Sequence, residues 1–111
     1  ASIAGIKGIG SSLAFAASKG ALNTKTKSMA RNLGPIRVNA ICPGFIQGEW
    51  LKKGLGEDLY NASLKNLESS TPLGLAVTPE QVADSIYNFA AISTTVTGET
   101  LLVDGGHHLT I

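Results

Sequence analysis

The longest regular alternation of apolar and polar residues runs from Ser11 to about Asn32 and predicts an α-helix. Large apolar residues recur in it at spacings of seven and four, which places them on one helix face. Either Ser11 or Ser12 can cap the first turn, because a serine hydroxyl accepts a hydrogen bond from a free amide group there. Gly34 and Pro35 then end the helix. The residues at the apolar spacings are Leu22, Met29 and Leu33.

A second helix is predicted from Pro79 to about Ala91. Thr78 is a favoured capping residue, Pro79 suits the first helical position, and Gln81 stands where the partner of a capping box is expected. An apolar stripe at helical spacing follows, made of Val82, Ile86, Phe89 and Ala90. Residues 49–72 predict one or two shorter helices that pack as a lid through leucines and one tryptophan.

Two short segments, residues 36–41 and 100–103, are rich in β-branched or apolar residues and predict buried strands. Turn residues follow each of them. Because helix 79–91 lies between the two, we expect parallel strands joined by a right-handed crossover. Residues 1–3 are predicted to be the tip of a further parallel strand, and residues 4–10 a loop. The pattern therefore predicts an α/β protein.

Composition and charge limit the number of domains and the classes of partner. With 111 residues, 43% hydrophobic and 15% charged, the chain has the composition of one small globular domain. A net charge of +1 gives no field that would attract nucleic acid or an anionic membrane. No apolar run of about eighteen residues is present, so we expect no membrane partner. The single cysteine, Cys42, cannot form an internal disulfide, and we expect a buried thiol in a cytoplasmic protein.

The candidate chemistry lies in the first nineteen residues. Phe15 and Lys19 stand one helical turn apart and share a helix face. Ser2 lies in the predicted strand tip upstream, from which its hydroxyl can reach the same place. The spacing resembles the active-site motif of the short-chain dehydrogenase/reductase family: a serine, a tyrosine thirteen positions later, and a lysine four positions after that. Residues 17–19 match the motif letter for letter, whereas Phe15 stands at the tyrosine position.

Two further signatures carry the same resemblance over nearly all of the chain. Residues 38–44 read Val-Asn-Ala-Ile-Cys-Pro-Gly, and residues 97–106 read Thr-Gly-Glu, a strand and Asp-Gly-Gly, both as in this family. The resemblance implies that Pro43, Gly44 and Ile46 hold the nicotinamide ring. The family commonly has threonine five positions after that proline, where this chain has Gly48.

The resemblance implies a fold and a set of partners. We expect the C-terminal half of a Rossmann-like, doubly wound parallel sheet, with residues 1–111 as one fragment that lacks the N-terminal nucleotide-binding half. It implies NAD or NADP as cofactor, a small carbonyl or alcohol substrate, and a homo-oligomer at full length. Ser2, Phe15 and Lys19 are the candidate catalytic positions, and Lys19, Pro43, Gly44 and Ile46 the candidate cofactor contacts.

Other motifs are interpreted as structural. The glycines of residues 5–10 do not fit a phosphate-binding loop, because that loop needs a full buried strand before it and a fixed glycine spacing. His107 and His108 are adjacent on backbone that we expect to be extended, so their side chains diverge, and we expect no metal site.

Three functions remain open at this stage. In the family, the tyrosine donates a proton to the substrate oxygen and the lysine lowers its pKa. Phe15 has no proton to give, which argues against ordinary turnover. The chain is therefore interpreted as part of an NAD(P)(H)-dependent oxidoreductase with an altered site, as a non-catalytic structural or regulatory relative, or as a degraded product without a role.

Overall fold

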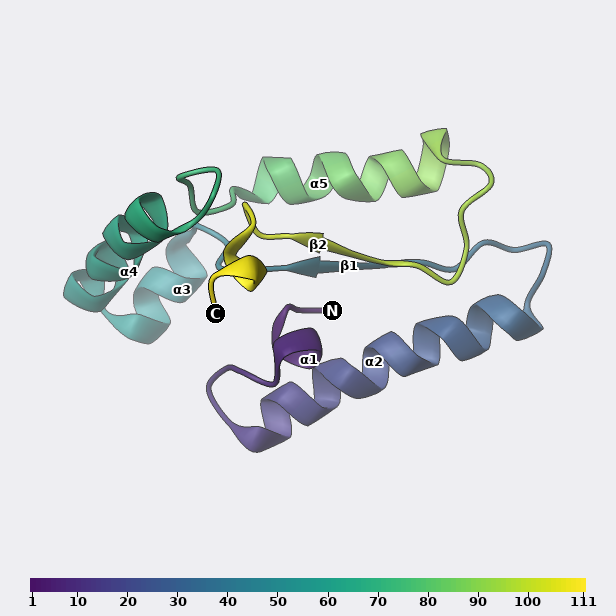
Figure 1. The fold of residues 1–111 in the computed structure, drawn as a ribbon, viewed down its shortest axis with the longest axis horizontal. Helices are drawn as coiled ribbons and strands as arrows, with labels where there is room; N and C mark the ends of the chain where they lie inside the picture. Colours follow the sequence, from purple (N-terminus) through teal and green to yellow (C-terminus); the bar gives the residue numbers. More distant parts are fainter.

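The computed structural model describes residues 1–111, which form helices around a pair of parallel strands (Figure 1). The chain begins with helix α1, Ala4–Lys7, and helix α2, Leu13–Asn32. Strand β1, Ala40–Pro43, follows, and then helices α3, Glu49–Leu55, and α4, Glu57–Ser70. Helix α5, Pro79–Tyr87, continues as a π-helical turn, Asn88–Ile92, before strand β2, Thr100–Val103. A short 3₁₀ turn, His107–Leu109, closes the chain.

Strands β1 and β2 are parallel neighbours, with Ala40 opposite Thr100 and Pro43 opposite Val103. In Figure 1 the strand pair runs between α5 on one side and α2 on the other. The α/β class, the parallel pairing and the helical connection between the strands are confirmed. The sheet contains two strands, so β1 keeps one edge without a strand partner.

Helices α2 and α5 begin where the sequence predicts. The Ser12 hydroxyl, not that of Ser11, caps α2 by accepting from the Phe15 amide at 3.1 Å. Thr78 and Gln81 form the complete capping box of α5, with their two reciprocal bonds at 3.2 and 2.9 Å. Both helix starts are determined by capping residues within a few positions, which explains why the sequence alone identifies them.

The predicted strand tip at residues 1–3 is wrong. Ser2 turns the chain, because its carbonyl accepts from the Gly5 amide at 3.1 Å and its hydroxyl accepts from the Ala4 amide at 3.1 Å. The residues predicted as a loop, 4–10, consequently begin with α1. The four-residue helix ends at Gly8, whose positive φ of 68° suits glycine.

The first predicted strand is displaced toward the C-terminus. Regular strand pairing starts only at Ala40. Before it, the side chains of Arg37 and Asn39 donate to backbone carbonyls of the facing segment and take the place of strand pairing. The Val38 amide likewise donates to the Thr97 hydroxyl at 3.0 Å. The strand then runs on to Pro43, two residues beyond its predicted end at residue 41.

Few residues are buried, and the apolar ones form two small groups. One group lies where α1 meets β1, and the other comprises residues of α4 and of the segment that follows it. Large apolar side chains such as Leu13 and Trp50 are 88% and 84% exposed. The buried apolar residues are Ile3, Ala4 and Cys42 in the first group, and Tyr60, Leu67, Ala76 and Val77 in the second.

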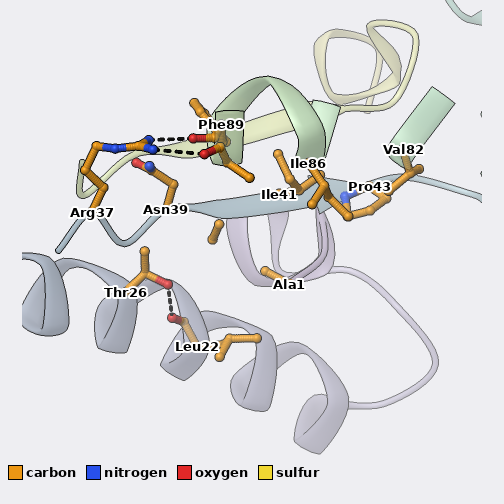
Figure 2. A pocket seen from close by; sticks show the side chains of 12 residues that line it. Ala1, Leu22, Thr26, Arg37, Asn39, Ile41, Pro43, Val82, Ile86 and Phe89 are labelled. Carbon is orange, nitrogen blue, oxygen red and sulfur yellow. Dashed lines mark hydrogen bonds between the residues drawn. The ribbon is translucent and has the colours of Figure 1, made fainter. Parts of the chain in front are cut away.

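An apolar groove of about 580 Å³ lies beside β1, bordered by residues of α2 and α5 (Figure 2). Leu22 of α2 and Ile86 of α5 contribute to its walls, and Ile41 of β1 lies between them. The stripe that sequence analysis assigned to α5 therefore faces this groove, and Ile86 remains 53% exposed. No helix of the chain has the length and apolar character needed to cross a membrane.

Candidate functional site

Phe15 and Lys19 lie together on the first turns of α2. The ammonium nitrogen of Lys19 is 5.3 Å from the centroid of the Phe15 ring, within the range of a cation–π contact. Lys19 takes part in no ion pair, so its ammonium protons are free for a ligand. The ring of Phe15 is 37% exposed. The predicted helical spacing thus brings the aromatic ring and the amine to one place.

Helix α1 brings Ser2 to the same region from the other side. Gly5 lies directly against the backbone of α2, where a Cβ atom on it would stand 2.4 Å from the carbonyl carbon of Lys19. The hydroxyl of Ser2 belongs to the first turn of the same short helix, through its bond to the Ala4 amide. Helix α1, whose start holds Ser2, therefore packs directly against the backbone of α2 at Lys19.

The Pro43–Gly44 corner at the end of β1 adjoins α1. The Pro43 carbonyl accepts from the Ile3 amide at 3.0 Å, and the Gly44 amide donates to the Val103 carbonyl at 3.1 Å. A Cβ atom on Gly44 would stand 2.8 Å from Cβ of Asp104, so the close approach of β2 requires glycine here. The serine, the lysine and the corner are thus joined by direct contacts through α1.

Ile46 presents free backbone groups beside this corner. It forms an isolated bridge with Val77: the Val77 amide donates to the Phe45 carbonyl at 3.2 Å, and the Gln47 amide donates to the Val77 carbonyl at 2.8 Å. The amide and carbonyl of Ile46 itself have no partner within the chain. An amide-bearing ligand can therefore bond to both.

These features fit a nicotinamide nucleotide. The unpaired amide and carbonyl of Ile46 complement a carboxamide, and the free ammonium of Lys19 complements ribose hydroxyls. The position at which a threonine would add another polar contact is Gly48, whose amide instead donates to the Tyr60 hydroxyl at 3.0 Å. No side chain of the residue at position 48 is therefore available to a ligand.

Sequence analysis missed the residue that closes this end of the sheet, Asp104. Its buried carboxylate accepts from the amides of Gly106 and His108, at 3.0 and 2.8 Å, and lies 2.9 Å from Nδ1 of His108. The expectation of extended backbone at the two histidines is wrong, because these bonds draw the chain into a 3₁₀ turn. An aspartate followed by two glycines was the available signal, since a carboxylate readily bonds amides two and four residues on.

Cys42 is fully buried at the centre of β1, as predicted. Its sulfur lies 3.4 Å from Oδ1 of Asn23 on α2. Burial raises the pKa of the thiol, although a hydrogen bond with the Ser2 backbone acts in the opposite direction. A buried protonated thiol is a poor nucleophile. Nowhere in the chain do three or more histidine, cysteine or acidic side chains gather as a metal site would require.

The fold and the site together define a class: Rossmann-like α/β proteins in which a short helix links a serine, a lysine-bearing helix and the Pro-Gly end of a parallel strand. Residues 1–108 match a family model described as enoyl-(acyl carrier protein) reductase. The chain belongs to the short-chain dehydrogenase/reductase family, and it corresponds to the C-terminal part of that fold.

Curated and structural relatives agree with this assignment. The 3-oxoacyl-(acyl-carrier-protein) reductase FabG of Chlamydia muridarum is 38% identical over 108 residues, covering 95% of this chain and 42% of that protein. A 3alpha-hydroxysteroid dehydrogenase of Mediterraneibacter gnavus is 39% identical over 107 residues, covering 94% of this chain and 41% of that protein. The chain thus spans about two fifths of the length of these relatives.

A solved small-chain dehydrogenase in complex with NADPH is also similar. It superposes with a TM-score of 0.87 at 33% identity, covering 98% of this chain and 49% of that one. The chain is therefore similar to reductases and dehydrogenases along nearly its whole length, and one of these holds a nicotinamide nucleotide.

Proposed function

We propose that the chain is the C-terminal part of an NAD(P)(H)-dependent oxidoreductase that acts on a small carbonyl or alcohol substrate. The observation that carries the proposal is the convergence of three elements: α1 with Ser2, the Phe15–Lys19 turn of α2, and the Pro43–Gly44 corner. Helix α1 adjoins both of the others: a Cβ atom on Gly5 would stand 2.4 Å from the carbonyl carbon of Lys19, and the Ile3 amide donates to the Pro43 carbonyl at 3.0 Å.

Each residue receives one role in this proposal. Ser2 polarises the substrate oxygen through its hydroxyl, and Lys19 binds the ribose through its ammonium group. Pro43, Gly44 and Ile46 hold the nicotinamide, with the free amide of Ile46 as the donor to its carboxamide. When bound, the nucleotide supplies or accepts the hydride. The scheme does not distinguish NAD from NADP, because no residue in it is assigned to the ribose phosphate by which the two differ.

Phe15 limits the chemistry of the site. Reduction of a carbonyl requires a proton at the oxygen as well as a hydride at the carbon, and a phenyl ring has no proton to donate. Loss of a positioned general acid lowers a rate by about 10²–10⁴-fold. We therefore propose that cofactor binding is retained and that turnover is slow.

The test is made on the full-length protein in two parts. Titration with NADPH and NADH, followed by nicotinamide fluorescence, is expected to give saturable binding that Lys19→Met weakens. The Phe15→Tyr variant is expected to raise carbonyl reduction by about 10²–10⁴-fold, because it restores the missing acid next to Lys19. Phe89→Tyr, which adds the same hydroxyl in the groove beside β1, is the matched control and should leave the rate unchanged. A Phe15→Tyr protein that neither binds nucleotide nor reduces a carbonyl contradicts the proposal.

A second candidate function is a non-catalytic structural or regulatory subunit. Phe15 and Gly48 favour it, since each lacks a polar group at the site while the surrounding packing is kept. In that case the unchanged protein binds partners or copies of itself without turnover. Wild-type turnover as fast as that of relatives with tyrosine would eliminate this alternative.

A further inference from the structure

Two glycines face each other where α1 crosses α2, and the space around them differs. A Cβ atom on Gly5 of α1 would lie 2.4 Å from the carbonyl carbon of Lys19 and 2.5 Å from the amide nitrogen of Gly20. A Cβ atom on Gly20 would find its nearest neighbour, the Gly5 carbonyl oxygen, at 3.6 Å, which is an ordinary contact. Only one side of this crossing therefore depends on the absence of a side chain.

The atoms that crowd Gly5 belong to backbone, so side-chain rotation cannot relieve the contact. A distance of 2.4 Å has to lengthen to at least 3.4 Å before it becomes ordinary van der Waals contact. Both positions are helical, where alanine is intrinsically favoured over glycine. Helix propensity alone thus predicts that alanine stabilises either position, whereas close packing predicts the opposite at Gly5.

The position of α1 also determines where Ser2 lies. The helix is only four residues long, and Ser2 is bonded into its first turn through the Ala4 and Gly5 amides. Its amino end contacts the Pro43 corner through Ile3, and its middle contacts the Lys19 backbone through Gly5. A shift of α1 relative to α2 consequently changes the position of Ser2 relative to the Lys19 backbone.

We propose that Gly5 is a positioning residue, whose missing side chain sets the separation between the Ser2 hydroxyl and the Lys19 ammonium group. The roles of Ser2 and Lys19 in this statement rest on the proposed function, but the geometric effect of Gly5 does not. Gly5 touches neither substrate nor cofactor. It acts through the distance between α1 and α2.

The experiment compares Gly5→Ala with Gly20→Ala in the full-length protein. Crystal structures are expected to show Ser2 displaced from Lys19 by about 1 Å in Gly5→Ala and unmoved in Gly20→Ala. Hydrogen exchange at the Lys7 and Gly8 amides, which donate within α1, should accelerate only in Gly5→Ala. Gly54→Ala in α3, where nothing lies within 4 Å, controls for helix propensity.

The proposal predicts that the melting temperature changes in opposite directions in Gly5→Ala and in the two control variants. Gly20→Ala and Gly54→Ala should raise Tm by roughly 2–4 °C, and Gly5→Ala should lower it. In the Phe15→Tyr background, Gly5→Ala should lower kcat on the order of 10²-fold while the KM for NADPH changes far less. A purely structural role would leave kcat per folded molecule unchanged.

An unchanged Ser2–Lys19 separation in Gly5→Ala, or a rise in Tm equal to that of Gly20→Ala, overturns the proposal. Failure of the proposed function gives a different result: no variant binds NADPH, although Gly5→Ala still displaces Ser2. The two ideas are therefore tested separately by the same set of proteins.

Discussion

Two sets of residues differ in their hydrogen bonding: the polar residues around the strands, called the frame below, and the residues at positions 15 and 48 of the proposed site. Around β1 and β2, the side chains of Arg37, Asn39 and Asp104 are each bonded to two or more backbone groups. At the proposed site, position 15 carries a phenyl ring without a hydroxyl and position 48 carries no side chain. These three side chains are all hydrogen-bonded, whereas the site that they surround lacks two polar groups.

This difference indicates that the fold and the chemistry depend on separate residues. Phe15 contributes packing to Lys19 and Gly10, and a tyrosine ring would make the same contacts. A hydroxyl on this ring is therefore not needed for the packing seen around Phe15. Changes in the frame are expected to alter stability strongly, and changes at positions 15 and 48 to alter it little.

The largest effect on stability is expected at Arg37. Its guanidinium donates to the carbonyls of Phe89, Ala90 and Ser93, so it caps the π-helical end of the α5 segment (Figure 2). Arg37→Met removes these charge-assisted bonds, and we expect a loss of about 2–4 kcal/mol in the free energy of unfolding, measured by urea titration.

Two matched variants sharpen this first prediction. Arg37→Lys keeps the charge but cannot reach three carbonyls with one compact ammonium group, so an intermediate loss is expected. Arg31→Met removes an exposed arginine from α2 and should change stability by less than about 0.5 kcal/mol. Equal losses for Arg31→Met and Arg37→Met would show that the carbonyl cluster does not stabilise the frame.

A smaller loss is expected at Asn39, which holds the turn before β2. Its amide nitrogen donates to the Val96 carbonyl at 2.9 Å, and its oxygen accepts from the Glu99 amide at 3.1 Å. Asn39→Ala removes both bonds and should cost about 1–3 kcal/mol. Asn32→Ala removes one exposed bond within α2 and serves as the control, with little expected change. If the two variants unfold at the same urea concentration, the turn does not depend on Asn39.

The sequence predicted the parts of this molecule that local signals determine. The α2 and α5 starts, strand β2 and the Phe15–Lys19 pair follow from caps and periodicity within a few residues. Helix α1 and the displaced start of β1 depend on contacts between distant segments, such as Gly5 with Lys19 and Arg37 with residues 89–93. Those contacts leave no periodic pattern in the sequence. From the sequence alone, Gly5 is therefore assigned to a loop and Arg37 has no predicted partner.

The candidate site follows the same division. Motif spacing identified Ser2, Lys19 and the Pro43–Gly44 corner, whose roles stay predictions. The contacts that join them could not be predicted, because they depend on the absence of a side chain at Gly5. The bond between Tyr60 and Gly48 was equally hidden, since twelve residues and a helix boundary separate the two.

The smallest expected effect lies at that boundary between frame and site. The Tyr60 hydroxyl accepts from the Gly48 amide at 3.0 Å, and its ring packs against Phe45 with centroids 5.6 Å apart. Tyr60→Phe keeps the ring and frees an amide that water can reach, so we expect a loss of only about 0.5–1.5 kcal/mol. Tyr87→Phe, with an exposed ring, is the control. If Tyr60→Phe lowers the free energy of unfolding as much as Arg37→Met does, the prediction is wrong. Helix α4 would then depend on the single bond between Tyr60 and Gly48, and Gly48 would count among the residues that stabilise the fold.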